Sequence, residues 1–411
     1  MTEPLVVRVG RLLDVERGEL LPDRRLLVAA DGRIEAVLAP DDAGPPAGTR
    51  QELDLARLTV LPGLIDVHTH LIGDLEFGGV PAIGQTAEEE LEAGRRNAVA
   101  TLNAGFTTVR DVGTYRAFLD CQLRDEIESS RTPGPRMQCA AGYVTKPLGA
   151  GEVTGDPSVP VPDEFRRGVV RTAEDARRVV NEFVDGGATM IKTLATGAVL
   201  TQGTDVDAVE LDAEMLGAIV AAAIARGVHV AAHAHGTSGI KLAIRAGVRS
   251  IEHGSFLDDE GIELLRRHGA WFVPTIFVGE WIAEVGQRDR WPAATLEKAK
   301  RTQATLDGAV RRARMAGARF AFGTDSGVYP HGLNAREFSH LVRLGFSPLD
   351  AIRSATIEAA TLMAWADDVG ALAPGRFADF LAVDGDPTTD IELLRTPIVV
   401  AKGGQVARDE R

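Results

Sequence analysis

The sequence predicts an α/β fold, a (β/α)8 TIM barrel with a small β-sandwich domain formed by the N- and C-terminal segments. Two observations support this prediction. In the middle of the chain, short apolar runs alternate with amphipathic helical stretches, which is typical of repeated βα units and a parallel sheet. At both ends the runs are strand-like only, and 411 residues are enough for one large barrel with an appendage.

The two chain ends are predicted to pair into one domain. Strand-like runs occur in both terminal parts, at residues 5–9, 25–29, 33–37, 379–383 and 398–402. Asp31-Gly32 supplies a hairpin turn between two of them. We therefore expect a composite β-sandwich domain from residues 1–58 and 373–411, with a barrel of residues 59–372 inserted between its halves.

The middle of the chain supplies the barrel. The predicted barrel strands end near His68, Arg110, Gly142, Thr193, His233, His253, Thr275 and Thr324. The predicted helices cover residues 88–103, 173–186, 212–226, 238–246, 258–268, 296–316 and 348–363. In this fold, functional side chains lie at the C-terminal ends of the strands and in the loops that follow them.

Charge and composition exclude some classes of partner. A net charge of -14 and a pI near 5.2 argue against nucleic acid and anionic membranes. The chain opens without a signal pattern and has no uncharged apolar run of about 18 residues, so we expect a cytoplasmic protein. Two cysteines are too few for a disulfide framework or a thiolate metal site. The expected partner is a small-molecule substrate, and a homo-oligomer is expected.

Metal-binding residue types gather at the predicted strand ends. In a strand, residues i and i+2 share a face, so each His-x-His pair can direct both imidazoles the same way. The residues at these strand ends are His68 and His70, Lys192, His233 and His235, His253, and Asp325. Because the C-terminal ends of all barrel strands meet at one face, this distribution predicts a shared site.

Imidazole and carboxylate groups without thiolates favour a catalytic site for Zn²⁺ or a similar divalent ion. A protonated lysine would be repelled by such ions, but reaction of Lys192 with CO₂ gives an anionic carbamate that can bridge two metals. That carbamate, Asp325 and a metal-bridging hydroxide would balance most of the charge of two divalent cations. Metal binding lowers the pKa of water toward about 7. Asp325 could then accept the proton of the attacking water and pass it to the leaving amine.

Three segments resemble the amidohydrolase superfamily in its binuclear form with a carboxylated lysine. They are Ala231-Ala232-His233-Ala234-His235-Gly236, Ser250-Ile251-Glu252-His253-Gly254 and residues 323–332. These motifs are most similar to the imidazolonepropionase-like branch, which includes Xaa-Pro and other dipeptidases, ochratoxin-type amidases and phenylurea hydrolases. The resemblance extends to Pro374-Gly375-Arg376-Phe377-Ala378-Asp379 near the C-terminus.

The resemblance implies roles for individual residues. His68 and His70 would bind the more buried metal with Asp325, and Lys192 would bridge it to a second metal. His233 and His253 would hold that second metal, and zinc is the expected ion. Spacing alone leaves His233 and His235 open as the ligand of this strand; the family pattern assigns the metal to His233 and turns His235 toward substrate.

Other candidates have plainer interpretations. His229 is expected to be a hydrogen-bonded interior histidine. His331 lies in a Gly- and Pro-rich loop. It is expected either to contact substrate or a metal ligand, or to have a purely structural role, and the sequence favours neither. Asp111 is expected to cap the turn that follows its strand. His268 and His340 fall in helical segments as surface or packing residues.

Loops over the strand ends should shape the substrate pocket. They are residues 71–85, 143–168 and 276–292, and the last carries Phe277, Trp281 and Trp291 as an aromatic pocket wall or as packing residues. Related dipeptidases tend to carry a Gly-Gly-His element after the third strand, where this chain has Pro147-Leu148-Gly149-Ala150-Gly151-Glu152. Tyr143 and Lys146 could replace that histidine in recognising a substrate carboxylate.

These observations predict a metal-dependent hydrolase that cleaves an amide-type C–N bond in a dipeptide or N-acyl amino acid. The alternative is a carbamate, phenylurea or cyclic amide hydrolase. A catalytically inactive barrel that serves as a scaffold is a third interpretation, but such proteins lose metal ligands, and here every expected position is filled.

Overall fold

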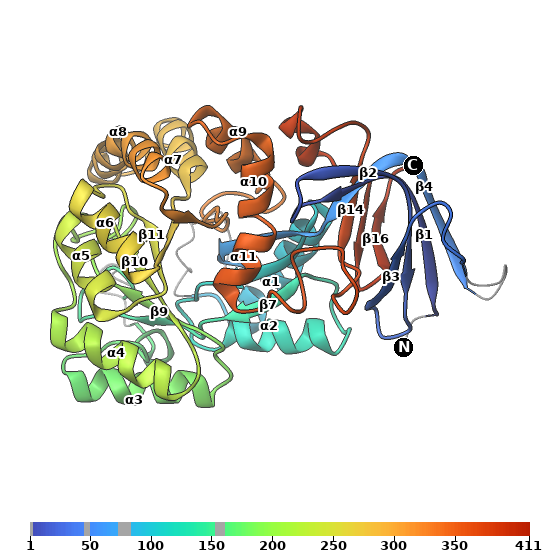
Figure 1. The fold of residues 1–411 in the computed structure, drawn as a ribbon. Coiled ribbons are helices and arrows are strands. Elements are labelled where there is room, and N and C mark those ends of the chain that lie inside the picture. Colours follow the sequence, from blue (N-terminus) through green and yellow to red (C-terminus); the bar gives the residue numbers. More distant parts are fainter. Residues whose placement is uncertain (1–2, 45–49, 73–83, 153–160) are drawn as a thin grey trace.

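The computed structural model describes residues 3–44, 50–72, 84–152 and 161–411. Helices surround a parallel barrel, and a curved β-sheet lies beside it (Figure 1). The barrel strands are β5 (Leu64–Thr69), β6 (Phe106–Asp111), β7 (Arg136–Cys139), β8 (Tyr143–Val144), β9 (Ile191–Leu194), β10 (Val230–Ala234), β11 (Ser250–His253), β12 (Trp271–Val273) and β13 (Arg319–Phe320). Every pair between them is parallel, which confirms the predicted barrel.

Two places in the barrel depart from regular strand pairing. The predicted third strand corresponds to β7, and the short strand β8 lies just beyond its predicted end at Gly142, within the segment expected as a loop; between β7 and β8, Ala141 adopts a φ of 64°. The barrel closes between β5 and the segment after β13, where Val67 N–H donates to Phe322 O and Asp325 N–H donates to His68 O. This closure places Asp325 directly beside the end of β5.

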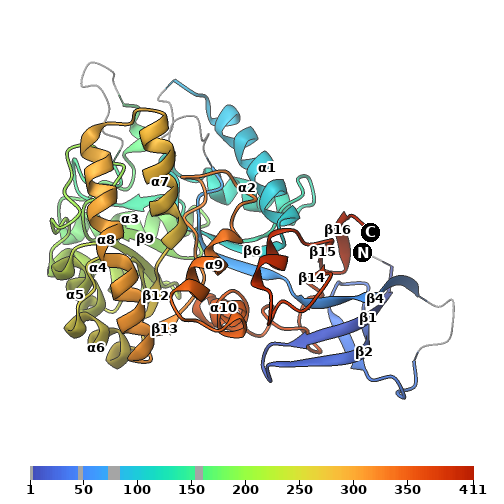
Figure 2. The same cartoon turned by 90° about the horizontal axis from the view of Figure 1, so that it is seen from above.

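Helices cover the outside of the barrel (Figures 1 and 2). They are α1 (Ala87–Asn103), α2 (Leu119–Glu128), α3 (Ala173–Asp185), α4 (Ala213–Ala225), α5 (Thr237–Ala246), α6 (Asp259–His268), α7 (Ile276–Arg288), α8 (Ala293–Met315), α9 (Arg336–Arg343), α10 (Pro348–Ser354) and α11 (Ile357–Met363). The predicted helix at 348–363 is two helices, because Thr356 leaves the helical region at φ -135° and ψ -100°. None of the described helices is both long and apolar enough to cross a membrane.

The segment 276–292, expected as a loop, is mostly the helix α7, and this expectation was wrong. Its first backbone N–H groups, on Ile276 and Phe277, donate to the carboxylate of Glu337 at 2.8 Å each. A buried carboxylate therefore caps the helix from outside its own sequence. The glycines at 279 and 286 lower the helix propensity, which the burial of Val278 and Ile282 outweighs.

Both chain ends contribute to one sheet, as predicted. Its strand order is β16-β15-β14-β4-β1-β2-β3, and the strands are β1 (Leu5–Asp14), β2 (Glu19–Val28), β3 (Ile34–Leu38), β4 (Gln51–Pro62), β14 (Phe380–Val383), β15 (Val399–Lys402) and β16 (Gln405–Asp409). Hydrogen bonds join them in one continuous sheet, which curves around its own hydrophobic cluster. Because β4 continues to Pro62, it crosses the expected boundary after residue 58; the exact domain limits stay a prediction.

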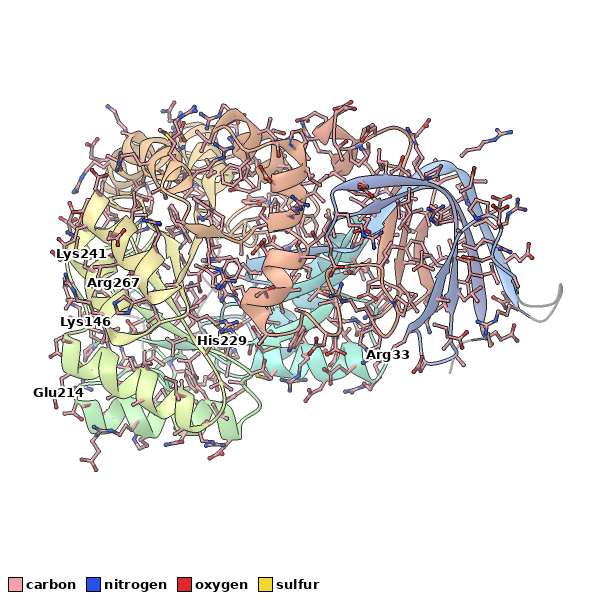
Figure 3. All side chains as sticks on the ribbon, viewed as in Figure 1. Arg33, Lys146, Glu214, His229, Lys241 and Arg267 are labelled. Carbon is pink, nitrogen blue, oxygen red and sulfur yellow. The ribbon has the colours of Figure 1, made fainter. Side chains whose placement is uncertain are left out.

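An aromatic contact joins the sheet to the barrel. Phe377 lies between two guanidinium groups, with Arg33 at 4.0 Å and Arg136 of β7 at 3.6 Å from its ring centre. Arg33, labelled in Figure 3, also donates to Asp368 Oδ1 at 2.7 Å. Arg136 donates to both carboxylate oxygens of Asp379. These contacts fix the orientation of the two parts.

Candidate metal centre

His68 of β5 and His70, which follows this strand, face Asp325 at the C-terminal end of the barrel. His68 Nε2 lies 3.4 Å and His70 Nε2 lies 3.3 Å from Asp325 Oδ1. His70 Nδ1 is 2.7 Å from the carbonyl oxygen of Gly113, which can only accept, so Nδ1 carries the proton and Nε2 offers a lone pair. His68 Nδ1 is bonded in the same way to Glu252 Oε2 at 2.8 Å.

His68 Nε2 is buried and has no hydrogen-bond partner within the described part of the chain. An unpaired buried nitrogen is costly unless a ligand occupies its lone pair. Ligand atoms of His68, His253 and Asp325 all lie within 4.8 Å of one another. This donor set therefore fits a divalent cation.

His233 and His253 complete the floor of the site from β10 and β11. Their ring centres are 4.5 Å apart, and that of His253 is 4.9 Å from His68. His233 Nε2 donates to Gly197 O at 3.2 Å, which leaves Nδ1 as its lone pair, and His253 Nδ1 contacts Thr275 Oγ1 at 2.7 Å. Burial holds the pKa of His233 and of His253 well below its ordinary value, so both rings are neutral, as metal ligands must be.

Lys192 of β9 lies buried among these groups. Its ammonium nitrogen forms no hydrogen bond with any described residue, although Asp325 and several histidines line the same cavity. Burial lowers the pKa of Lys192 to about 8, against the opposing attraction of Glu252 and Asp325. A neutral amine is the form that reacts with CO₂, so this environment favours the chemistry expected of Lys192.

Asp325 occupies a strained position. Its φ is 60° and that of His253 is 69°, both in the left-handed region that non-glycine residues rarely adopt. Although burial opposes ionisation, His68 and His70 hold the pKa of Asp325 well below its ordinary value. Gly327 allows the loop to approach, because a side chain there would stand 2.5 Å from His70 O.

Three further residues were expected to contact substrate. His235 lines the cavity above the metal ligands, with Nδ1 2.9 Å from Ser255 Oγ and its ring stacked on His253. Tyr143 also lines the cavity, but its hydroxyl donates to Gly113 O at 3.0 Å. His331 lies outside the lining: its nitrogens contact Thr101 Oγ1 and His70 O, so the geometry favours support of His70.

The remaining candidates have structural surroundings. Asp111 accepts from Gly113 N–H and Leu71 N–H, which confirms the turn cap and adds an anchor for the loop after His70. His229, labelled in Figure 3, precedes β10; its buried Nε2 has no hydrogen bond to any described residue, contrary to expectation. His268 is exposed on α6, and His340 lies on α9, 3.6 Å from Glu280.

The loops expected to form the pocket are described in part. Residues 73–83 of the first and 153–160 of the second lie outside the described residues. Phe277, Trp281 and Trp291 pack in a hydrophobic cluster behind the cavity and do not line it, so the packing interpretation of these aromatic residues holds. Lys146 is likewise absent from the described lining.

A buried ion pair beneath the metal ligands was not predicted. Arg110 of β6 donates to Glu252 Oε1 at 2.8 Å, and both side chains are fully buried. Glu252 holds His68 with its other oxygen, and Arg110 also donates to Val67 O and Ser250 Oγ. The signal available in the sequence was one charged residue of opposite sign within each of two predicted barrel strands.

Replacing Glu252 with leucine is expected to lower the free energy of unfolding by about 3–5 kcal/mol, because Arg110 would keep a buried charge without a partner. Denaturant unfolding measures this loss. The double replacement Arg110→Met/Glu252→Leu removes both charges and should be less destabilised than the single variant. Glu263→Ala, on an exposed ion pair of α6, is the control and should change stability by less than about 1 kcal/mol. Equal stability of Glu252→Leu and the wild type would contradict the prediction.

The fold and this constellation define the class of protein. The chain belongs to the amidohydrolase family, whose model matches residues 59–407, so it is a hydrolase acting on carbon–nitrogen bonds. Ochratoxinase from Aspergillus niger is 30% identical over 95% of this chain and 84% of its own length. Imidazolonepropionase from Salinispora arenicola is 27% identical over 93% of each chain. A crystal structure of a Xaa-Pro dipeptidase with bound methionine superposes with a TM-score of 0.89 at 32% identity, covering 98% of this chain and 99% of that one. The predicted branch of the superfamily is confirmed.

Proposed function

We propose that the protein is a binuclear metal-dependent amide hydrolase, with two zinc ions held by His68, His70, His233, His253, Asp325 and a carboxylated Lys192. The observation that carries this proposal is the fixed direction of the lone pairs. Gly113 O accepts from Nδ1 of His70, and Gly197 O accepts from Nε2 of His233. The other ring nitrogen of each histidine, Nε2 of His70 and Nδ1 of His233, therefore keeps a lone pair for a metal.

Bound divalent ions would supply hydroxide at neutral pH and polarise the scissile carbonyl. The protein contributes positioning and proton transfer. Asp325, beside His68 and His70, would accept the proton of the attacking water and deliver it to the leaving nitrogen. Glu252 fixes the ring orientation of His68, and Thr275 fixes that of His253.

The bond cleaved is an amide-type C–N bond. The similar proteins named above include a dipeptidase and an ochratoxinase, which supports the expected dipeptide or N-acyl amino acid, with carbamates, ureas and cyclic amides as the alternative. The cavity of about 130 Å³ opens directly above the metal ligands, so a small substrate can reach them.

Elemental analysis of the purified protein should find about two divalent ions per chain, and a chelator should remove both the metal and the activity. His233→Ala should lose about one ion per chain, the ion that His233 shares with His253. The ion held by His68, His70 and Asp325 should remain. His268→Ala, on the exposed end of α6, is the matched control and should keep both ions. Absence of metal after zinc-supplemented expression would refute the proposal.

A further inference from the structure

The cavity above the metal ligands has two different surfaces. Its floor carries the histidines, Lys192 and Asp325. Its outer side, here called the apolar wall, is built by the loop after β9 and by helices α7 and α8, which lie side by side on one flank of the barrel (Figure 2). The apolar wall consists of Val199, Leu200, Val278, Ile282, Ala299 and Leu306.

No lysine, arginine or carboxylate of the described residues lines the cavity beyond Lys192 and Asp325 on the floor. Beside the apolar wall, the polar side chains include Tyr115, Thr201, Thr302 and Gln303, and none of these four carries a charge. The ranges outside the description, 1–2, 45–49, 73–83 and 153–160, contain no lysine, arginine or histidine in their sequence. They therefore cannot contribute a basic side chain to the cavity.

The basic residues of α8 beside the apolar wall are already engaged. Lys298 donates to the carbonyl oxygens of Ala198 and Thr201 at 2.7 Å each and of Thr204 at 3.3 Å, which uses all three ammonium protons. Arg301 pairs with Asp205 and Asp207. Lys298 thus holds the loop that carries Val199 and Leu200 against α8, and it builds the apolar wall instead of offering its charge to a ligand.

A carboxylate next to the apolar wall would lose its hydration without gaining a cation, which is a large penalty for a buried charge. An aromatic or alkyl group would instead gain from burial, and a cavity of about 130 Å³ is close to the ~150 Å³ of an engineered cavity that binds benzene. We propose that the group beyond the scissile bond is uncharged and apolar where it meets the apolar wall, so the preferred substrates are amides, carbamates or ureas that carry an aryl or alkyl group at that end. This inference rests on the proposed hydrolase function.

A matched pair of compounds tests the inference. N-benzoyl-2-phenylethylamine and N-benzoyl-2-(4-carboxyphenyl)ethylamine differ only in a carboxylate at the end remote from the scissile bond. The metal-loaded enzyme should cleave the neutral amide with a kcat/KM at least about 100-fold higher, in line with the cost of an unpaired buried carboxylate. Equal rates, or a preference for the acid, would overturn the inference and leave the hydrolase function standing.

Calorimetric titration of both compounds separates the two proposals. Tighter binding of the neutral amide supports the inference even if neither compound is cleaved, an outcome that would count against the hydrolase function alone. Equal binding, tighter binding of the acid, or no binding of either compound would overturn the inference.

A charge placed at the edge of the apolar wall should weaken the preference for the neutral amide. Gln303→Lys is expected to raise kcat/KM for the acid relative to the neutral amide by about tenfold or more, because the carboxylate then has a partner. Gln303→Met is the matched control without a charge and should leave this ratio unchanged. The same ratio in both variants would contradict the uncharged wall as the determinant.

Discussion

Replacing Lys192 with alanine is expected to reduce kcat to below about 1% of the wild-type value, because the group that bridges the proposed metals is lost. The side chain is buried among His68, His253 and Asp325, and alanine leaves those ligands in place. Metal content measured on the same preparation should fall. Lys241→Ala is the control: this lysine forms ion pairs with Asp258 and Glu260 on the outer helices and should be dispensable for activity.

Chemical rescue distinguishes a carbamate from an amine at this position. Acetate or propionate can enter the space that Lys192 vacates and supply two oxygens, so part of the lost activity should return as either acid is added. Chloride at the same concentration controls for ionic strength. Full activity of Lys192→Ala without any acid would refute a bridging role.

Changing Asp325 to asparagine should lower kcat by about 100-fold or more while much of the metal is retained. The amide keeps an oxygen to face His68 and His70, but it cannot accept the proton of the attacking water. Steady-state kinetics and metal analysis together measure the two effects separately. Asp259→Asn, with a side chain 90% exposed, is the control. An unchanged kcat would assign proton transfer to another group.

The location of the site could be predicted because it follows from backbone geometry. In a parallel barrel the C-terminal ends of the strands meet at one face, so His68, Lys192, His253 and Asp325 had to converge once the strands were recognised. The prediction needed only the period of the apolar runs and the residue types at their ends.

The parts that could not be predicted depend on contacts between distant segments. The hydroxyl of Tyr143 donates to Gly113 O, which follows a different strand, and Ala141 before it adopts a left-handed φ that its residue type does not predict. Helix α7 is capped by Glu337 of α9, which follows α8 and β13 in the chain. The residues just before α7 therefore carry no capping signal that a sequence pattern could detect. The Arg110–Glu252 pair likewise joins separate strands.

The pairing of β4 with both β1 and β14 has a consequence for synthesis of the protein on the ribosome. β1 and β4 can pair as soon as Pro62 has emerged, but β14 follows only after the whole barrel has been translated. Until then, the edge of β4 that later receives Phe380 exposes unpaired backbone groups, which other chains can bind. Nascent chains that stall within the barrel should therefore be prone to aggregation and should depend on chaperones that shield strand edges.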